Sequence, residues 1–421
     1  MSDELSFVVW KRLVIIQMTC ASLSFMASSL VAIAILRNSD GGLKSPYRRI
    51  IFGISVSDIL QSLSLLAGPF TIPSAAPQGR WAIGNYRTCQ IDGFFFSFSA
   101  GSTPMYMFGL CLCTVLKIKR NMTDEVFTQK IEKVMHLLII LFNLIPCIVA
   151  LATKSINGTY LGSVCAFSAF PTGCRQRPDL FGECDPAIAD SAAVLALYSY
   201  LAMPILCLFG IIGCMGMICG HIFQTTRLPR RRNILLATRS ESNSSASSDN
   251  ESQNDTQDLQ EIRRRQIESN LQESETMIRV YRRELILQAC FVVLAFFTTF
   301  LFWWVTNITL LSGKQPSVFL LYAFALLYPL AGFFNVLLFA RQKVSSFRIR
   351  HSEYSWFQAL LLFIKAGGES PSMVDPSMES SITMTAWQIN STPFKVQDSI
   401  VNDLSVARQY LFHGAGSLQR I

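Results

Sequence analysis

Seven apolar runs dominate the sequence, and each is long enough to cross the roughly 30 Å of hydrocarbon at the centre of a bilayer. The runs cover residues 13–36, 50–72, 91–116, 134–152, 192–223, 285–311 and 318–340. Of the 421 residues, 51% are hydrophobic and 15% are charged, against roughly 25% charge in a soluble chain. Because a helix satisfies its own backbone polar groups inside a bilayer, we predict an all-α membrane protein, a seven-transmembrane helix bundle over residues 13–340.

Lys and Arg indicate the orientation of the bundle, because they collect on the cytoplasmic side of membrane proteins. Four lie between the first and second runs and five between the third and fourth, whereas two lie between the second and third and one between the sixth and seventh. Lys11 and Arg12 argue for the opposite orientation, but the short loops outweigh them. We therefore predict an extracellular N-terminus and a cytoplasmic C-terminus.

The loop between the fourth and fifth runs has the chemistry of an extracellular face. It contains the sequon Asn157-Gly158-Thr159, which predicts a glycosylated Asn157. Eight of the twelve cysteines lie within apolar runs, where a thiol behaves as a small hydrophobic group. The other four are Cys89, Cys165, Cys174 and Cys184. Four cysteines allow three pairings, and the residues alone leave the choice open.

The segments outside the bundle are short, amphipathic or polar. Residues 1–12 form a short extracellular N-terminus with no ligand-binding domain, which favours a small-molecule or short-peptide ligand. Residues 227–283 form a long, partly disordered cytoplasmic loop, and 367–421 form a disordered cytoplasmic tail, because they are rich in small polar residues. Their serines are expected to attract kinases or arrestin-like proteins. Basic and apolar residues are interspersed over 341–350, and 356–364 is apolar but too short to cross a bilayer, so we predict that 341–366 is an amphipathic segment on membrane lipids.

The sequence offers little for catalysis. Its four histidines form no HExxH motif, and the last apolar run has no lysine for a retinal Schiff base. We therefore predict that the protein is not an enzyme and binds no metal ion or cofactor. The basic residues lie in the segments between spans, so we predict no nucleic-acid partner.

Asp58 is the single acid deep within an apolar run, and an acid held there is functional by default. A receptor would use Asp58 as part of an internal switch. The alternative interpretation is a seven-span transporter or channel subunit that uses Asp58 for cation coupling. A third interpretation is a membrane scaffold that works through its loop and tail.

Aromatic residues in the predicted outer halves of the third, fifth, sixth and seventh spans favour an apolar ligand pocket between helices. They are Phe94, Phe98, Tyr198, Trp303, Trp304 and Tyr322. Pro146, Pro204 and Pro329 each remove a backbone hydrogen bond within a span, so these spans are expected to bend or pivot there.

Three segments resemble a known family. The last span contains Tyr328-Pro329-Leu330-Ala331-Gly332-Phe333-Phe334-Asn335, and the second contains Ser57-Asp58-Ile59-Leu60. Trp81, Gly84 and Cys89 precede the third span. Over about residues 13–347, the chain resembles the G-protein-coupled receptors, and the last-span segment is similar to the cyclic-AMP-receptor-like branch. The Asp-Arg-Tyr motif of animal receptors is absent from the inner end of the third span.

The resemblance implies a function and roles for particular residues. It implies a plasma-membrane receptor that moves helices to signal to a cytoplasmic transducer, a heterotrimeric G protein. By the same resemblance, Cys89 pairs with Cys165, which leaves Cys174 and Cys184 to close a local loop. The internal switch would be Asp58, Thr103, Pro329 and Asn335. The transducer contact would be Lys117, Lys119, Arg120, Arg279, Arg282 and Arg283.

Overall fold

The computed structural model describes residues 3–37, 43–74, 81–120, 122–159, 163–171, 174–175, 182–243, 283, 286–287, 290–350 and 353–359. The predictions for the tail at 367–421, for most of the loop at 227–283 and for Arg279 and Arg282 lie outside the described residues.

Seven helical spans of membrane length occur in the described part of the chain, as the sequence predicts. The first three are single helices: α1 (Asp3–Arg37), α2 (Pro46–Thr71) and α3 (Tyr86–Arg120). The fourth is α4 (Asp124–Phe127), η1 (Thr128–Glu132) and α5 (Lys133–Ala152), and the fifth is α7 (Pro186–Ala196), η2 (Leu197–Ala202) and α8 (Met203–Asn243). The sixth span is Cys290–Leu311, and the seventh is α10 (Val318–Leu327), η3 (Tyr328–Leu330) and α11 (Ala331–Arg350). The protein is therefore a multi-pass membrane protein.

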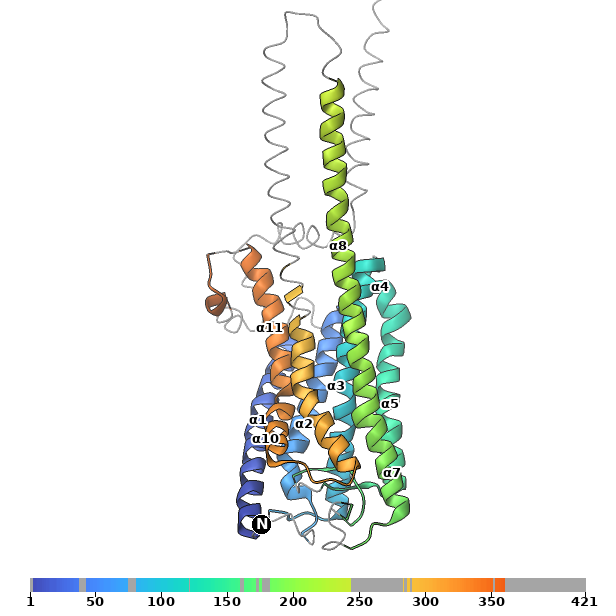
Figure 1. Cartoon of the computed structure of the whole chain (residues 1–421), viewed down its shortest axis with the longest axis vertical. Helices are drawn as coiled ribbons and strands as arrows, with labels where there is room; N and C mark the ends of the chain where they lie inside the picture. Colours follow the sequence, from blue (N-terminus) through green and yellow to red (C-terminus); the bar gives the residue numbers. More distant parts are fainter. Residues whose placement is uncertain are drawn as a thin grey trace, which may run out of the picture.

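The spans stand side by side, and α8 extends well beyond the labelled helices next to it, at the end of the bundle away from the N-terminus (Figure 1). Helix α3 packs against α2, α5 and α8. The faces that point away from the bundle are apolar; on α5, Leu137, Ile145 and Ile148 are each more than half exposed. Such a surface is stable against lipid and would be costly in water.

The helices continue past the predicted ends of the apolar runs. Helix α1 begins at Asp3, so most of the predicted N-terminal segment 1–12 is helical, and α8 continues to Asn243, inside the predicted loop at 227–283. Helix α11 likewise extends to Arg350, inside the segment at 341–366. Hydrophobicity marks where a helix leaves the bilayer, but polar helix-forming residues can prolong it in water.

Two of the three prolines coincide with a change of helix type. Pro204 follows the π-helical turn η2, and Pro329 lies within the 3-10 turn η3. Pro146 lies within α5, which remains α-helical on both sides of it. Since proline cannot donate the helical hydrogen bond, a neighbouring turn can rewind to keep the other backbone groups bonded.

A β-hairpin closes one end of the bundle. Strands β1 (Ile156–Gly158) and β2 (Cys165–Phe167) pair antiparallel, with Asn157 opposite Ala166, and both strands pack against α3. Cys89 of α3 and Cys165 of β2 form a disulfide, and Cys174 and Cys184 form a second. These are the pairings that the family resemblance implies.

Polar side chains of two helices, α1 and α3, also fasten the β-hairpin. Gln17 of α1 donates through Nε2 to the backbone oxygens of Leu65 and Ser163, each at 3.3 Å. The carboxylate of Asp92 on α3 accepts hydrogen bonds from Thr71 and from the backbone N–H of Cys165. Asp92 is 6% exposed, so these donors replace the water that a buried carboxylate loses.

Gly68 lets α2 approach the β-hairpin closely. A Cβ atom at Gly68 would lie 2.5 Å from the Ser163 carbonyl oxygen and 3.0 Å from the Val164 Cα, both backbone atoms. We predict that Gly68→Ala lowers the free energy of unfolding by about 1–3 kcal/mol, because the hairpin must shift to admit the methyl group. Thermal unfolding of the purified protein measures this. Gly213→Ala is the matched control, since nothing lies within 4 Å of a Cβ there, and equal unfolding temperatures for both variants would contradict the prediction.

Candidate functional site

A cavity of about 90 Å³ lies beneath the β-hairpin, between the hairpin, the fifth span and the sixth span. Its lining residues from the hairpin and the loop after it are Thr159, Val164, Ala166, Phe167, Ser168, Ala169 and Arg175. Those from the helices are Ala189, Ala192, Ala193, Ala196, Tyr200, Trp303, Thr306, Asn307, Leu310, Leu311 and Phe324. A mostly apolar cavity with a few polar groups is typical of a small-ligand site.

Tyr200 joins the cavity wall to the β-hairpin and to α3. Its hydroxyl forms a 2.6 Å hydrogen bond with the Ser97 hydroxyl and accepts one from the Phe167 backbone N–H at 3.3 Å. Its ring stacks on Phe167 with centroids 5.2 Å apart. Tyr200 is 2% exposed, so both ends of this side chain are fixed by packing and hydrogen bonds.

Trp303 connects the cavity to the middle of the bundle. Its ring lies edge-on to Tyr200, with centroids 5.1 Å apart, and stacks on Tyr328 with centroids 4.4 Å apart and planes 10° apart. Tyr328 is fully buried and begins η3, where the seventh span changes helix type. A ligand that displaces Trp303 would therefore press directly on η3.

Asp58 lies on α2, is 2% exposed and is hydrogen-bonded on both carboxylate oxygens. Thr103 of α3 donates to Oδ1 at 2.9 Å, and Asn335 of α11 donates through Nδ2 to Oδ2 at 2.8 Å. The structure thus brings together three of the four residues predicted as an internal switch. The fourth, Pro329, lies in η3, six residues before Asn335.

The predicted aromatic pocket needs correction. Trp303 lines the cavity, whereas Trp304 is not among the lining residues and packs against Phe296 and Phe300. Four others are only partly buried and do not line the cavity: Phe94, Phe98, Tyr198 and Tyr322.

Helix geometry explains the error in the fifth span. Tyr198 and Tyr200 are two residues apart within η2, so they project from different sides of the helix, and Tyr200 is the one that faces the bundle. The sequence signal that could have identified Tyr200 was the presence of a second tyrosine two positions after Tyr198. The contributions of the β-hairpin and Arg175 had no comparable signal, because their positions depend on disulfides and long-range packing.

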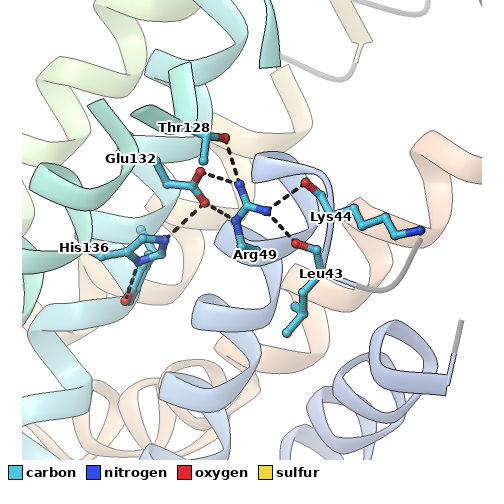
Figure 2. Close-up of polar contacts among 7 residues, drawn as sticks. Leu43, Lys44, Arg49, Thr128, Glu132 and His136 are labelled. Atoms are coloured by element: carbon cyan, nitrogen blue, oxygen red, sulfur yellow. Dashed lines mark hydrogen bonds and ion pairs between the residues drawn. The ribbon is translucent and has the colours of Figure 1, made fainter. Parts of the chain in front are cut away.

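A second polar site, which the sequence did not predict, lies at the opposite end of the bundle, centred on Arg49 and Glu132 (Figure 2). Arg49 binds the Glu132 carboxylate through Nε at 2.5 Å and Nη2 at 2.6 Å. Nη2 also donates to the Thr128 hydroxyl, and Nη1 donates to the backbone oxygens of Leu43 and Lys44. All five N–H groups of this guanidinium are therefore used.

The clasp formed by Arg49 and Glu132 extends into α3. His136 lies with Nε2 3.6 Å from Glu132 Oε1, and its Nδ1 forms a 3.1 Å hydrogen bond with the Tyr106 hydroxyl. The Tyr106 ring passes over Gly53, where a Cβ would come within 2.8 Å of it. The clasp thus ties the α1–α2 loop, α2, α3 and the fourth span together.

Basic residues predicted to contact a transducer lie at the same end. Lys117 forms an ion pair with Asp124 of α4, and Lys119 and Arg120 are exposed in the last turn of α3. Arg283 is also exposed. Their contact with a transducer stays a prediction.

The structure buries the side chain of Asn157, the residue of the predicted sequon, in the β-hairpin. This side chain is 3% exposed, and its Nδ2 donates to the backbone oxygens of Lys154 at 3.0 Å and Ser168 at 2.9 Å. The nitrogen that would carry a glycan is therefore buried and has both hydrogens engaged.

Comparison with known proteins identifies the fold. No protein-family model matches the sequence, and no curated protein does. Among solved structures, squid rhodopsin is similar, with a TM-score of 0.52 and 12% sequence identity over 92% of each chain. At this identity the likeness establishes a rhodopsin-like seven-transmembrane fold, and the cyclic-AMP-receptor-like branch stays a prediction.

Asn157 supplies a direct test of the β-hairpin. We predict that Asn157 carries no glycan. Wild type and Asn157→Gln should therefore migrate alike on a denaturing gel, both before and after enzymatic removal of N-linked glycans. Asn157→Gln should instead lower the free energy of unfolding by about 1–3 kcal/mol, because two buried carbonyls lose their donor. A glycan-dependent band that disappears in Asn157→Gln would contradict the burial of this side chain.

A second prediction concerns the stability that the clasp formed by Arg49 and Glu132 contributes. Glu132→Gln should lower the free energy of unfolding by about 2 kcal/mol, less than for a fully enclosed pair because the Arg49 side chain is 27% exposed. Thermal unfolding measures the loss, with Glu125→Gln as the control because Glu125 is exposed on α4. An equal effect of the two substitutions would show that Arg49 and Glu132 do not stabilise the fold as a pair.

Proposed function

We propose that the protein is a receptor of the G-protein-coupled type in the plasma membrane. A small ligand binds in the cavity beneath the β-hairpin, and the bundle passes the signal to a heterotrimeric G protein at the opposite end. In this proposal the hairpin and N-terminus are extracellular, and α8 projects into the cytoplasm. The rhodopsin-like fold supports the proposal.

The main support for this proposal is a connected path from the cavity to Asp58, which runs through Trp303 and the seventh span. Trp303 belongs both to the cavity wall and to the stack with Tyr328. Tyr328 and Asn335 lie seven residues apart on the seventh span, and Asn335 binds Asp58. A ligand that favours a different position of Trp303 would shift the population of seventh-span conformations, and with it the Asp58 hydrogen bonds.

The chemistry of the two ends supports the orientation. Disulfides persist in an oxidising compartment, and both disulfides lie at the β-hairpin end. The basic residues of the clasp and of the end of α3 lie at the other end, as expected for a cytoplasmic face. Lys119, Arg120 and Arg283 offer exposed cations there for a transducer.

The transporter interpretation fits the Asp58 geometry less well. A coupling site must exchange its cation repeatedly, and such pathways use several ionisable groups across the membrane. Both Asp58 oxygens are occupied by neutral donors from α3 and α11, which suits a group that reports on helix positions.

The test is nucleotide exchange on a panel of purified G proteins in membranes containing the protein. We predict that Asp58→Asn keeps the fold but lowers exchange on the responsive G protein by about fivefold or more, because the hydrogen bonds between α2, α3 and α11 change. Asp190→Asn is the matched control, since Asp190 is exposed on α7. Exchange on no G protein, together with ion currents or uptake that vanish in Asp58→Asn, would overturn the proposal in favour of a transporter.

A further inference from the structure

The cavity beneath the β-hairpin is lined by one cation, for which the described part of the chain provides no acidic partner. Among the lining residues that the structure describes, Arg175 is the charged one, and none is Asp or Glu. The guanidinium donates through Nη2 to the Ala189 carbonyl oxygen at 2.8 Å. Because a guanidinium has five N–H donors, most of its hydrogen-bonding capacity is left for a ligand.

The second disulfide holds Arg175 in place. Its neighbour Cys174 is 2% exposed, is bonded to Cys184, and donates its backbone N–H to the Pro171 oxygen at 3.1 Å. With the bond to Ala189, the chain and the side chain of Arg175 are both anchored beside the cavity. A fixed cation costs little additional ordering when a ligand binds.

The rest of the cavity wall is suited to an apolar group. Four alanines of α7 form one side, at positions 189, 192, 193 and 196, and Trp303, Tyr200 and Phe324 form another. Asn307 donates one N–H to the Trp303 carbonyl at 2.8 Å, which leaves its second N–H and its oxygen for a ligand.

The volume limits the ligand. A protein cavity of roughly 150 Å³ admits benzene, so the 90 Å³ here admits a molecule of only a few non-hydrogen atoms. The single guanidinium suits one planar anion, because carboxylate and guanidinium can form two parallel hydrogen bonds. Both limits point to a small monoanion with a short apolar part.

We propose that this cavity binds a small monocarboxylate, with its carboxylate on Arg175 and its hydrocarbon part between Ala192 and Trp303. The proposal rests on the proposed function, in which this cavity is the ligand site of a receptor. It adds the chemical class of the ligand. Binding alone tests it, so its outcome is independent of whether the protein activates a G protein.

The experiment measures the unfolding temperature of the purified full chain in detergent. The probes are sodium acetate, propionate and butyrate, each compared with sodium chloride at the same ionic strength and with the uncharged methyl ester. We expect at least one acid to raise the unfolding temperature in a saturable manner, because a ligand that binds the folded state stabilises it. The ester and chloride should raise it much less.

Two substitutions locate the binding site. Arg175→Ala should weaken the apparent affinity of the responding acid by about tenfold or more, since it removes a charge-assisted hydrogen bond. Ala193→Leu should do the same by filling the cavity while leaving Arg175 intact. Lys314→Ala is the matched control, because Lys314 is an exposed cation in the loop between the sixth and seventh spans and does not line the cavity; it should bind as wild type does.

The outcomes separate this proposal from the receptor proposal. An unfolding temperature that no acid raises above the chloride value, or a response that is equal in wild type and Arg175→Ala, would overturn the monocarboxylate proposal. Binding that depends on Arg175 supports it even when no G protein responds, in which case the receptor proposal fails alone. Should either variant unfold before it can be assayed, Arg175→Lys, which keeps the charge but loses the planar fork, should bind the acid more weakly than wild type.

Discussion

A carboxylate inside a membrane bundle must find hydrogen-bond donors within the protein, and at Asp58 this requirement fixes the relation of three helices. Asp58 and Asn335 are 277 positions apart in sequence, yet their side chains meet at 2.8 Å. Removing either donor would leave a buried acceptor unsatisfied, at a cost of about 1–3 kcal/mol. Gly332 allows this meeting, since a Cβ there would lie 3.0 Å from the Asp58 Cβ.

The position of the cavity follows from the same contact. Asn335 and Tyr328 are seven residues apart, close to two helical turns, so they share one side of the seventh span. Fixing Asn335 on Asp58 therefore also aims Tyr328 into the bundle, where it stacks on Trp303. Trp303 in the cavity wall and Asp58 are thus connected through the seventh span. The more tightly wound turn η3 lies on this path.

How far the sequence determined these features depends on the range of the interactions. The spans followed from the length of apolar runs, and Asp58 was found because an acid is rare within such a run. Thr103 and Asn335 were named through the family resemblance. Glu132 was overlooked because it precedes the fourth apolar run and resembles a loop residue, whereas the helix begins earlier, at α4. Its burial to 4% of the side chain depends on Arg49, 83 positions away.

The cavity was the least predictable part for a related reason. Whether a helical residue faces the cavity depends on its position around the helix axis. An error of two residues in η2 therefore selects Tyr198 in place of Tyr200. Its other wall is a β-hairpin with no apolar signal of its own, which is placed by Cys89, Gln17 and Asp92 on two helices. Sequence patterns describe single elements well, but a site made where a loop meets several helices is set by their joint packing.

The two ends of the bundle are held by different kinds of interaction, and this difference bears on how a signal could cross it. At the hairpin end, two covalent bonds and buried hydrogen bonds hold the cover over the cavity. At the other end, the described contacts between helices include the ion pair of Lys117 with Asp124, whose carboxylate is 52% exposed, so water or a bound protein can replace this contact. A small movement of Trp303 beneath a fixed cover must be accommodated by the spans below it. Because the end held by ionic contacts yields at the lower cost, the larger rearrangement is expected there, on the face that is proposed to meet the transducer.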